Sequence, residues 1–329
     1  MANQVCVIGS NSFSGASFCK HLLEQGYEVC GISRSPEPVK ALLPYAWTNN
    51  HNMAFHQLDL NNDLSEIDTL LDKVRPSHVY NFAAQSMVGQ SWDFPEHWFM
   101  TNAVSMIKLH NLLRHKDYMD KYIHISTPEV YGSCSGFVDE SEAFNPSTPY
   151  AVSRAAADMS LKTFFDVHKF PVVTTRAANV YGEGQQLYRI VPKTIMSIML
   201  GLKLPLHGGG HSERAFIHID DVSDATLKIG VNGTAGHSYH ISTKETVSIR
   251  QLVATICELL NVEFEQACEV TDDRPGKDAA YLLNANKLRN ELGWTDSISL
   301  HSGVERCVDW AKQNFEVLKT QSLDYIHRI

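Results

Sequence analysis

The chain has 329 residues, of which 43% are hydrophobic and 20% are charged, and its formal net charge is -9. A chain of this length and composition can bury a large core as one large or two ordinary domains, so we expect a globular protein. The charge is spread along the sequence without a basic stripe, which argues against nucleic acid or an anionic membrane as a partner.

The cysteines and the first residues both indicate a cytoplasmic protein. The seven cysteines form no CxxC pair, and most lie inside apolar stretches, as reduced core thiols do. Residues 1–5 lead directly into a strand pattern, and no stretch approaches about 20 uninterrupted apolar residues. We therefore expect neither a secretion signal nor a membrane span.

Short apolar runs alternate with longer stretches of helical period from residue 4 to about residue 177. The predicted strands are Gln4–Ile8, Glu28–Ile32, Ala54–Leu58, His78–Phe82, Tyr122–Ser126 and Val172–Arg176, and the predicted helices lie near 14–25, 63–74, 96–115 and 149–168. Because parallel strands need a crossover connection, usually a helix, this alternation predicts an α/β fold with a Rossmann-type, doubly wound parallel sheet. Ligands of such sheets collect at the carboxyl ends of the strands.

The regular alternation stops near residue 180, where pieces rich in Gly and Pro begin to separate shorter elements. We predict a dinucleotide-binding domain over residues 1–177, with later segments of about 212–242 returning to it. One of these segments, beginning at Asp220, is expected to form a helix that packs on the first domain. The remainder of 178–329 is expected to form a smaller lobe that mainly binds substrate.

A glycine turn follows the first predicted strand. Glycine permits a tight turn and close packing of helix on strand, and the N-terminus of the following helix offers N–H groups to a pyrophosphate. Ser12 stands where the G-x-x-G-x-x-G pattern has its middle glycine, so a turn without a ligand is the alternative. The strand-turn-helix context favours a dinucleotide site, for which the candidate residues are Gly9, Asn11, Ser12, Phe13, Ser14 and Gly15.

Ser33 and Arg34 follow the second predicted strand, where an acidic residue would bond the adenosine ribose of NAD. A cation suits the 2′-phosphate of NADP, so we favour NADP and keep NAD as the alternative, because a solvated loop Arg is common. Two further pairs at strand ends are candidates for cofactor contacts and are equally compatible with ordinary strand ends: Asp59 and Leu60 near the adenine, and Ala83 and Ala84 where the cofactor must approach closely.

Tyr150 and Arg154 lie at the start of the predicted helix 149–168, and their i, i+4 spacing puts them on one face. A phenol beside a fixed cation ionises more easily, so it can exchange a proton with a hydroxyl whose carbon exchanges hydride with nicotinamide. Thr127 and Glu129 follow the fifth strand and bring a hydroxyl and a carboxylate to the same sheet edge. Each residue alone has an ordinary structural alternative, but together, at strand ends, they indicate an active site.

At these residues the chain resembles the extended short-chain dehydrogenases/reductases, and within them the nucleotide-sugar 4,6-dehydratases of the GDP-mannose and dTDP-glucose types. The resemblance runs nearly from end to end. Its landmarks are the Gly9 turn, the segments 75–86, Ser126-Thr-Pro-Glu-Val-Tyr-Gly132, Tyr150-Ala-Val-Ser-Arg154, Arg176-Ala-Ala-Asn-Val-Tyr-Gly182, 214–221, Arg274-Pro-Gly276 and Leu292-Gly-Trp294.

The resemblance implies a chemistry in which Tyr150 takes the proton of the sugar 4-hydroxyl while hydride passes from C4 to a tightly bound NAD(P). Glu129 would then remove the C5 proton, and loss of the C6 hydroxyl would give an enone that recovers the hydride at C6. Thr127 would hydrogen-bond the C4 oxygen. The 16 histidines show no HExxH or paired metal spacing, so we expect no metal site. The resemblance also implies a homodimer or homotetramer, cofactor contacts from Gln85 and Asn102, and nucleotide-sugar contacts from Ser86, Asn179, Val191, Lys193, Arg214 and Arg274.

Two residues of the active-site motifs depart from the family pattern. The family has Lys where Arg154 stands, and guanidinium keeps the charge but is bulkier and differently hydrated. The dTDP-glucose type has an Asp that protonates the leaving hydroxyl where this chain has Pro128, so Glu129, protonated at C5, would serve as the acid. An epimerase, decarboxylase or 4-keto reductase of the same family stays open as an alternative, as does a non-catalytic dinucleotide-binding protein.

Overall fold

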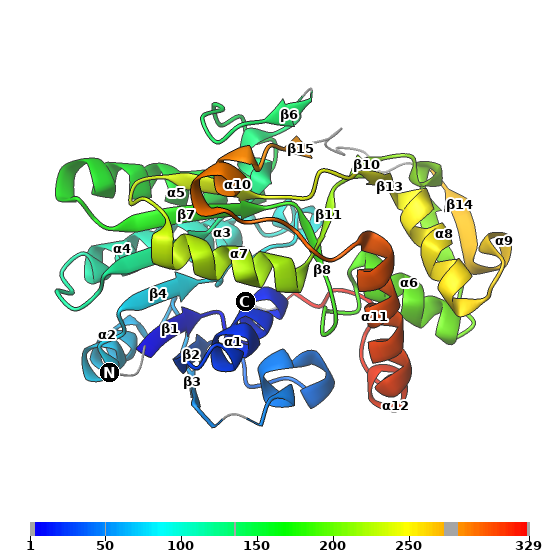
Figure 1. The fold of residues 1–329 in the computed structure, drawn as a ribbon, viewed down its shortest axis with the longest axis horizontal. Helices are drawn as coiled ribbons and strands as arrows, with labels where there is room; N and C mark the ends of the chain where they lie inside the picture. The colour runs from blue at the N-terminus through cyan, green and yellow to red at the C-terminus, as the bar shows by residue number, and fades with distance from the viewer. Residues whose placement is uncertain (1–3, 50, 135, 273–281, 328–329) are drawn as a thin grey trace.

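The computed structural model describes residues 4–49, 51–134, 136–272 and 282–327, which form two lobes (Figure 1). The larger lobe contains a seven-stranded sheet in the order β12-β7-β5-β4-β1-β2-β3, and every neighbouring pair is parallel. Its strands are β1 (Gln4–Ile8), β2 (Glu28–Ser33), β3 (Met53–Gln57), β4 (His78–Asn81), β5 (Lys121–Ile125), β7 (Val172–Ala177) and β12 (Ser238–Ile241). The predicted Rossmann-type fold is confirmed, and the first six strands match the predicted ones within one residue at each end.

Alternate residues of the central strand β1 serve the two faces of the sheet, as the two-residue period of a strand requires. Val5 and Val7 pack with Phe18 of helix α1, whereas Cys6 and Ile8 pack on the opposite side in another cluster. Helices α1 (Phe13–Glu24) and α7 (Ile219–Asn232) cover the first face, and α2 (Leu64–Val74), α4 (Met106–Leu113) and α5 (Pro149–His168) cover the second. Both faces are buried, so the strands are apolar runs rather than alternating ones.

The helix predicted near 96–115 is present, but a π-helical segment interrupts it. Helix α3 (Pro95–Phe99) begins with proline, whose fixed φ suits the first helical position, and continues through a π-helical turn at Met100–Ser105 into α4. Asn102 lies in this turn with a fully buried side chain. Wide turns of this kind frequently occur at functional sites.

The smaller lobe packs helices around an apolar core that contains Val191, Ile195, Leu252, Ile256 and Val304. Its elements are α6 (Ile190–Met199), α8 (Ile249–Leu260), α9 (Phe264–Ala267), α11 (Leu300–Gln313), α12 (Phe315–Leu318), β9 (Leu204–His207), β10 (Glu213–Arg214), β13 (Val247–Ser248) and β14 (Cys268–Thr271). Further short elements are β6 (Phe137–Val138) paired with β15 (Leu282–Leu283), β8 (Asn179–Tyr181) paired with β11 (Phe216–His218), and α10 (Asn286–Leu292).

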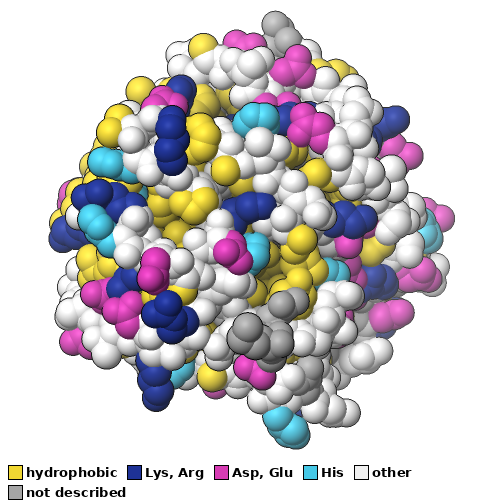
Figure 2. Space-filling view, turned by 60° about the vertical axis from the view of Figure 1, so that its left-hand side comes forward, with side chains coloured by type: hydrophobic (Ala, Val, Ile, Leu, Met, Phe, Trp, Pro, Cys, Tyr) yellow, Lys and Arg dark blue, Asp and Glu magenta, His cyan; other side chains and the backbone are white. Residues whose placement is uncertain are grey.

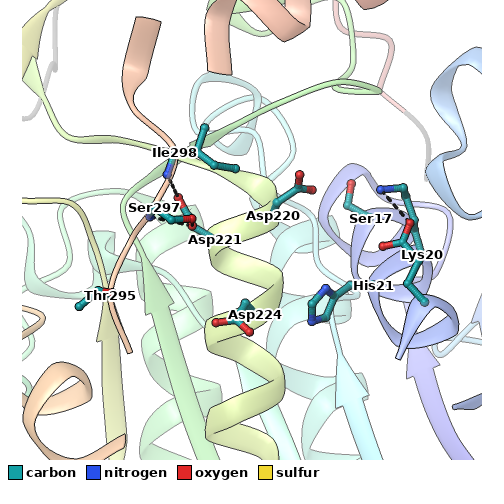
Figure 3. Close-up of a pocket in the computed structure, with 10 residues that line it drawn as sticks. Ser17, Lys20, His21, Asp220, Asp221, Asp224, Thr295, Ser297 and Ile298 are labelled. Carbon is teal, nitrogen blue, oxygen red and sulfur yellow. Dashed lines mark hydrogen bonds and ion pairs between the residues drawn. The ribbon is translucent and has the colours of Figure 1, made fainter. Parts of the chain in front are cut away.

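The helix expected to begin near Asp220 is α7, and it packs on α1 beside a polar cavity of 240 Å³ (Figure 3). Across this cavity, His21 of α1 faces Asp224 of α7, and Ser17 of α1 faces Asp220. Asp221 accepts hydrogen bonds from the backbone N–H groups of Ser297 and Ile298, both at 3.0 Å, and so fastens the segment before α11 to the larger lobe. None of the residues that line the cavity is a predicted site residue.

The surface carries both signs of charge. On the face in Figure 2, Lys and Arg side chains are interspersed with Asp and Glu side chains, with hydrophobic side chains showing between them. A phosphate on this face is therefore met by individual cations rather than by one positive field. Within the described part of the chain, no helix combines the length and the apolar character that a membrane span needs.

Candidate active site

The glycine turn lies at the carboxyl end of β1 and leaves no room for a side chain at either glycine. Gly9 has φ +85°, and a Cβ there would lie 2.6 Å from the backbone nitrogen of Ala83. A Cβ on Gly15 would lie 2.1 Å from the carbonyl oxygen of Gly9. The turn, the segment after β4 and the start of α1 thus meet closely at one sheet edge, as a cofactor cradle requires.

Ser12, which stands at the position of the middle glycine, forms two side-chain hydrogen bonds within the turn. Its Oγ donates to the Gly9 carbonyl at 2.7 Å and accepts from the Gly15 N–H at 3.1 Å, which makes Ser12 the N-cap of α1. Asn11 connects the turn to the end of β2, because its side-chain amide donates to the Ser35 carbonyl at 2.9 Å. The departure at Ser12 therefore preserves the strand-turn-helix geometry on which the prediction depended.

Thr127, Glu129, Tyr150 and Arg154 come together at the carboxyl end of β5. Thr127 caps the short 3₁₀-helix Pro128–Tyr131, with its Oγ1 accepting from the Glu129 N–H at 3.3 Å, and its hydroxyl hydrogen-bonds the Tyr150 phenol. Arg154 is 2% exposed and donates from its guanidinium to the Ile125 carbonyl, at the end of the strand. The spacing predicted that Arg154 lies on the same helix face as Tyr150. The hydrogen bond to the Ile125 carbonyl in addition holds the guanidinium in place.

The electrostatic surroundings of Tyr150 act in both directions. Burial raises the pKa of the phenol, the charge of Arg154 lowers it, the Glu129 carboxylate raises it, and the hydrogen bond with Thr127 lowers it. The sum keeps the pKa of Tyr150 above its ordinary value in the ligand-free chain. A phenol that is protonated at rest and flanked by a fixed cation and a carboxylate is equipped to exchange protons with a bound hydroxyl.

A second cation faces Tyr150 from the segment before α6. The charge of Arg189 also lowers the pKa of Tyr150, and its guanidinium donates to the Ser86 Oγ at 3.3 Å. Lys193, one turn further along α6, forms an ion pair with Asp324 at 3.0 Å. Tyr150 and Glu129 thus lie at the sheet edge, and Arg189 and Lys193 lie at the start of α6 in the smaller lobe.

Comparison with known proteins agrees with this geometry. The family model described as GDP-mannose 4,6 dehydratase matches residues 6–307. The chain belongs to the GDP-mannose 4,6-dehydratase family. It is 30% identical to the dTDP-D-glucose 4,6-dehydratase of Bos taurus over 95% of this chain and 90% of that protein, and 28% identical to the dTDP-glucose 4,6-dehydratase of Neisseria gonorrhoeae over 94% and 96%.

Solved structures resemble the fold of this family member closely. The dTDP-glucose 4,6-dehydratase DesIV from Streptomyces venezuelae, solved with NAD and TYD bound, has a TM-score of 0.89 at 26% identity and covers 98% of this chain and 100% of its own. The UDP-glucuronic acid 4-epimerase from Bacillus cereus, in complex with UDP-glucuronic acid and NAD, has a TM-score of 0.85 at 26% identity, with coverage of 94% and 99%. The family is thus NAD(P)-dependent and acts on nucleotide sugars.

The side chains of several residues predicted to contact cofactor or substrate instead contact other parts of the protein. Asn102 bonds the backbone of Gln85 in both directions, at 2.8 and 2.9 Å, and donates to Ser153 at 3.0 Å, so it braces the loop after β4 against α5. Three predicted residues, Phe13, Leu60 and Val191, have buried side chains within apolar clusters, where only their backbone is available to a ligand.

The other predicted residues are divided between the two lobes. Asp59 accepts from the Asn61 backbone at 3.0 Å, and Asn179 donates to the Ala215 carbonyl at 3.2 Å. Arg214 donates to the carbonyl of its neighbour Glu213 at 2.8 Å. Arg274 lies outside the described residues.

A buried ionic network directly behind Tyr150 and Arg154 escaped the sequence analysis. Asp158, four residues after Arg154 on α5, accepts from Arg176 and from Ser126, both at 2.7 Å, and lies 3.3 Å from His124. Burial raises the pKa of Asp158, but Arg176, His124 and Arg154 outweigh it and hold that pKa well below its ordinary value. The i, i+4 spacing places Asp158 on the same helix face as Arg154 and could have indicated its burial. Its partners, however, lie on or next to β5 and β7, so only the three-dimensional structure identifies them.

Proposed function

We propose that this protein is a nucleotide-sugar 4,6-dehydratase, which converts a nucleoside-diphosphate hexose or N-acetylhexosamine into its 4-keto-6-deoxy derivative. The observation that carries the proposal is the position of Glu129 beside Thr127 and Tyr150. Oxidation at C4 alone requires the phenol and its cation. A carboxylate in the same site is needed when a carbon acid, the C5 position next to the new ketone, must lose its proton.

The site fits a dinucleotide, since the two glycines at the end of β1 have no space for a Cβ and the following helix presents its capped N-terminus there. When bound, NAD(P) supplies the hydride acceptor and, in its oxidised form, a positive charge near the phenol. The residues proposed to hold it are Gly9, Asn11, Ser12, Phe13, Ser14, Gly15, Ser33, Arg34, Asp59, Leu60, Ala83, Ala84, Gln85, Asn102, Tyr150 and Arg154. Phe13 and Leu60 would do so through their backbone, and Asn102 by bracing Gln85.

The proton steps follow from the positions of the side chains. Tyr150 accepts a proton only as the phenolate, so its own proton leaves to solvent first, which the fixed charge of Arg154 and the hydrogen bond with Thr127 favour. The phenolate then takes the proton of the sugar 4-hydroxyl as C4 is oxidised. Glu129 takes the C5 proton and returns it to the departing C6 hydroxyl, which leaves as water. Pro128 has no side-chain donor for this step, and Glu129 is the carboxylate that the site offers. The product then gains hydride at C6 and a solvent proton at C5.

The substrate diphosphate and sugar are assigned to Ser86, Thr127, Asn179, Val191, Lys193, Arg214 and Arg274. Arg and Lys suit phosphate oxygens because of their charge and, for Arg, its forked donors. We add Arg189 to this group, since its guanidinium contacts Ser86 and its charge reaches Tyr150.

The experiment that tests this function is incubation of the purified protein with NAD(P) and with GDP-, UDP- and dTDP-linked hexoses and N-acetylhexosamines, followed by mass analysis. Loss of water supports dehydration. An altered sugar of unchanged mass would instead assign the chain to the epimerases, and loss of carbon dioxide from a hexuronate to the decarboxylases. No change with any sugar, in a protein that binds the cofactor, would leave a non-catalytic binding protein.

A variant separates the role of Glu129 from that of the oxidation step. In Glu129→Gln, deuterium from solvent should no longer enter C5, while some cofactor reduction remains. Glu142→Gln changes an exposed carboxylate nearby and is the matched control. Retained deuterium entry in Glu129→Gln would refute its role as the base.

We also propose NADP as the preferred cofactor, on the basis of Ser33 and Arg34 at the end of β2, where no carboxylate takes the first position after the strand. A cytoplasmic location is proposed from the seven cysteines, all of which are free thiols.

A homodimer or homotetramer is proposed from an exposed apolar stripe on the helices that lie side by side at the second face of the sheet. Val104 and Ile107 are each 40% exposed, and Met159 of α5 is 61% exposed. Ile107 lies on α4 and Met159 on α5, and these two helices contact each other. Apolar side chains gathered in this way on packed helices typically mark a contact between subunits.

A further inference from the structure

The chain beyond α12 turns back from the smaller lobe towards the larger one (Figure 1). Leu323 packs against the apolar core of the smaller lobe, and His327 reaches helix α3 of the larger lobe. We call residues Leu323–His327 the strap. Its contacts therefore lie on both lobes.

At its first contact, the strap places a carboxylate on a proposed phosphate-binding cation. Asp324 Oδ1 lies 3.0 Å from Lys193 Nζ, and the Asp324 side chain is 86% exposed. An ion pair this exposed contributes little to stability. A ligand phosphate would approach the same ammonium group and would carry more charge than one carboxylate.

Tyr325 packs against Tyr188, the residue that precedes Arg189. Its ring meets the Tyr188 ring edge-on, with centroids 5.3 Å apart at 80°. Burial and Tyr188 raise the pKa of Tyr325, while the charges of Arg34 and Arg189 lower it. The phenol therefore lies within reach of the cation proposed for the NADP phosphate and of the cation beside Ser86.

His327 anchors the strap to α3 and to the residue before it. Its ring stacks on Trp98, with centroids 5.0 Å apart at 15°, and on Phe94, 5.1 Å apart at 8°. Its Nε2 lies 2.9 Å from Nδ1 of His97, so the two imidazoles share a hydrogen bond. Three aromatic neighbours give this end of the strap more contact area than the ion pair gives the other end.

We propose that the strap is an inhibitory contact, which holds Lys193 through Asp324 and is displaced when a nucleoside diphosphate binds. This inference rests on the proposed function for the roles of Lys193 and Arg34. The physical argument is that Asp324 pairs with Lys193, and that the charge of Arg189 acts on Tyr325, while both cations are assigned to the diphosphate. A site that is open for only a fraction of the time binds its ligand more weakly by that fraction.

The test is the affinity of the whole protein for dTDP, GDP and UDP, measured by titration calorimetry. The variant Asp324→Asn/Tyr325→Ala/His327→Ala removes the three contacts, and the single variant Asp324→Asn removes the ion pair alone. Ile326→Ala is the matched control, because this strap residue is 63% exposed. If the strap is closed for about nine-tenths of the time, the triple variant should bind the preferred nucleotide about tenfold more tightly than the parent chain, and Asp324→Asn should show part of that gain.

Each remaining outcome overturns the proposal: equal or weaker binding in both variants, the same gain in Ile326→Ala, or binding of none of the three nucleotides by any of the proteins. Failure of the proposed function has a different signature. In that case the triple variant gains nucleotide affinity, yet neither it nor the parent chain releases water from any nucleotide sugar.

Discussion

Replacing Asp158 by Asn removes one charge from the buried network behind Tyr150 and keeps the size of the side chain. The carboxylate and the Arg176 guanidinium are each 3% exposed and lie 2.7 Å apart. In the variant, Arg176 stays buried without its counter-ion, and His124 loses the carboxylate 3.3 Å away. The desolvation of Arg176, which the pair offsets in the parent chain, is then uncompensated.

The size of the effect follows from burial. Breaking a buried ion pair by removing one partner costs about 3–5 kcal/mol, whereas an exposed i, i+4 pair on a helix contributes about 0.3–0.5 kcal/mol. The same helix offers the control, since Asp166 pairs with Lys162 at 2.7 Å with side chains 51% and 76% exposed. Asp166→Asn should therefore change the free energy of unfolding by less than about 0.5 kcal/mol.

The assay is urea unfolding of both variants at neutral pH, followed by far-ultraviolet circular dichroism, with midpoint and slope fitted separately. A double variant, Asp158→Asn/Arg176→Gln, should cost less than the sum of the two single changes, because the partners are in contact. If Asp158→Asn destabilised the protein no more than Asp166→Asn, the argument that burial makes this network structurally important would be refuted.

Four further predictions follow. Gly15→Ala should lower the free energy of unfolding by about 1–3 kcal/mol and weaken cofactor binding, because its Cβ would lie 2.1 Å from the Gly9 carbonyl oxygen; Gly89→Ala, where a Cβ has open space, should do neither. Burial raises the pKa of Glu183, but its partners His218 and Arg306 bring it down to about 2. The stability from Glu183 is present above about pH 4.5 and is lost as the pH falls towards 2. Of the total of about 3 kcal/mol, about 2 kcal/mol is lost between pH 5 and 3, and Glu183→Gln should remove this change from unfolding measured in that range. Arg34→Ala should weaken NADP binding by at least tenfold and leave NAD binding nearly unchanged in calorimetry, and equal losses would contradict the assignment of NADP. Ile107→Asp should shift sedimentation towards a monomer, whereas an unchanged sedimentation coefficient would place the subunit contact elsewhere.

The strands and the proposed catalytic residues illustrate what could be predicted from the sequence. Six strands of the sheet are short, apolar and separated by helical periods, so local pattern alone located them within one residue. Thr127, Glu129, Tyr150 and Arg154 follow strand ends or begin a helix, and parallel strands bring all such positions to one sheet edge. The proximity of these four residues could therefore be predicted from the topology of the sheet alone.

The network around Asp158 and the brace at Asn102 could not be predicted in this way. Asn102 bonds Gln85 and Ser153, which lie 17 and 51 residues away, and Asp158 bonds Ser126, 32 residues away. Polar residues inside helices usually face solvent, so the pattern gave no sign that these two are buried. The seventh strand, β12, joined the sheet from a segment 61 residues beyond the end of β7.

The sequence by itself determined the parallel sheet, the glycine turn and the types of side chain at its edge, because these depend on contacts within a few residues and on the period of the elements. Only the tertiary structure decided what surrounds them. The counter-ions of Arg176, the carbonyl partner of Arg154 and the strap on Lys193 come from distant parts of the chain. Burial and ion pairing depend on those three-dimensional distances, and no spacing along the chain specifies them.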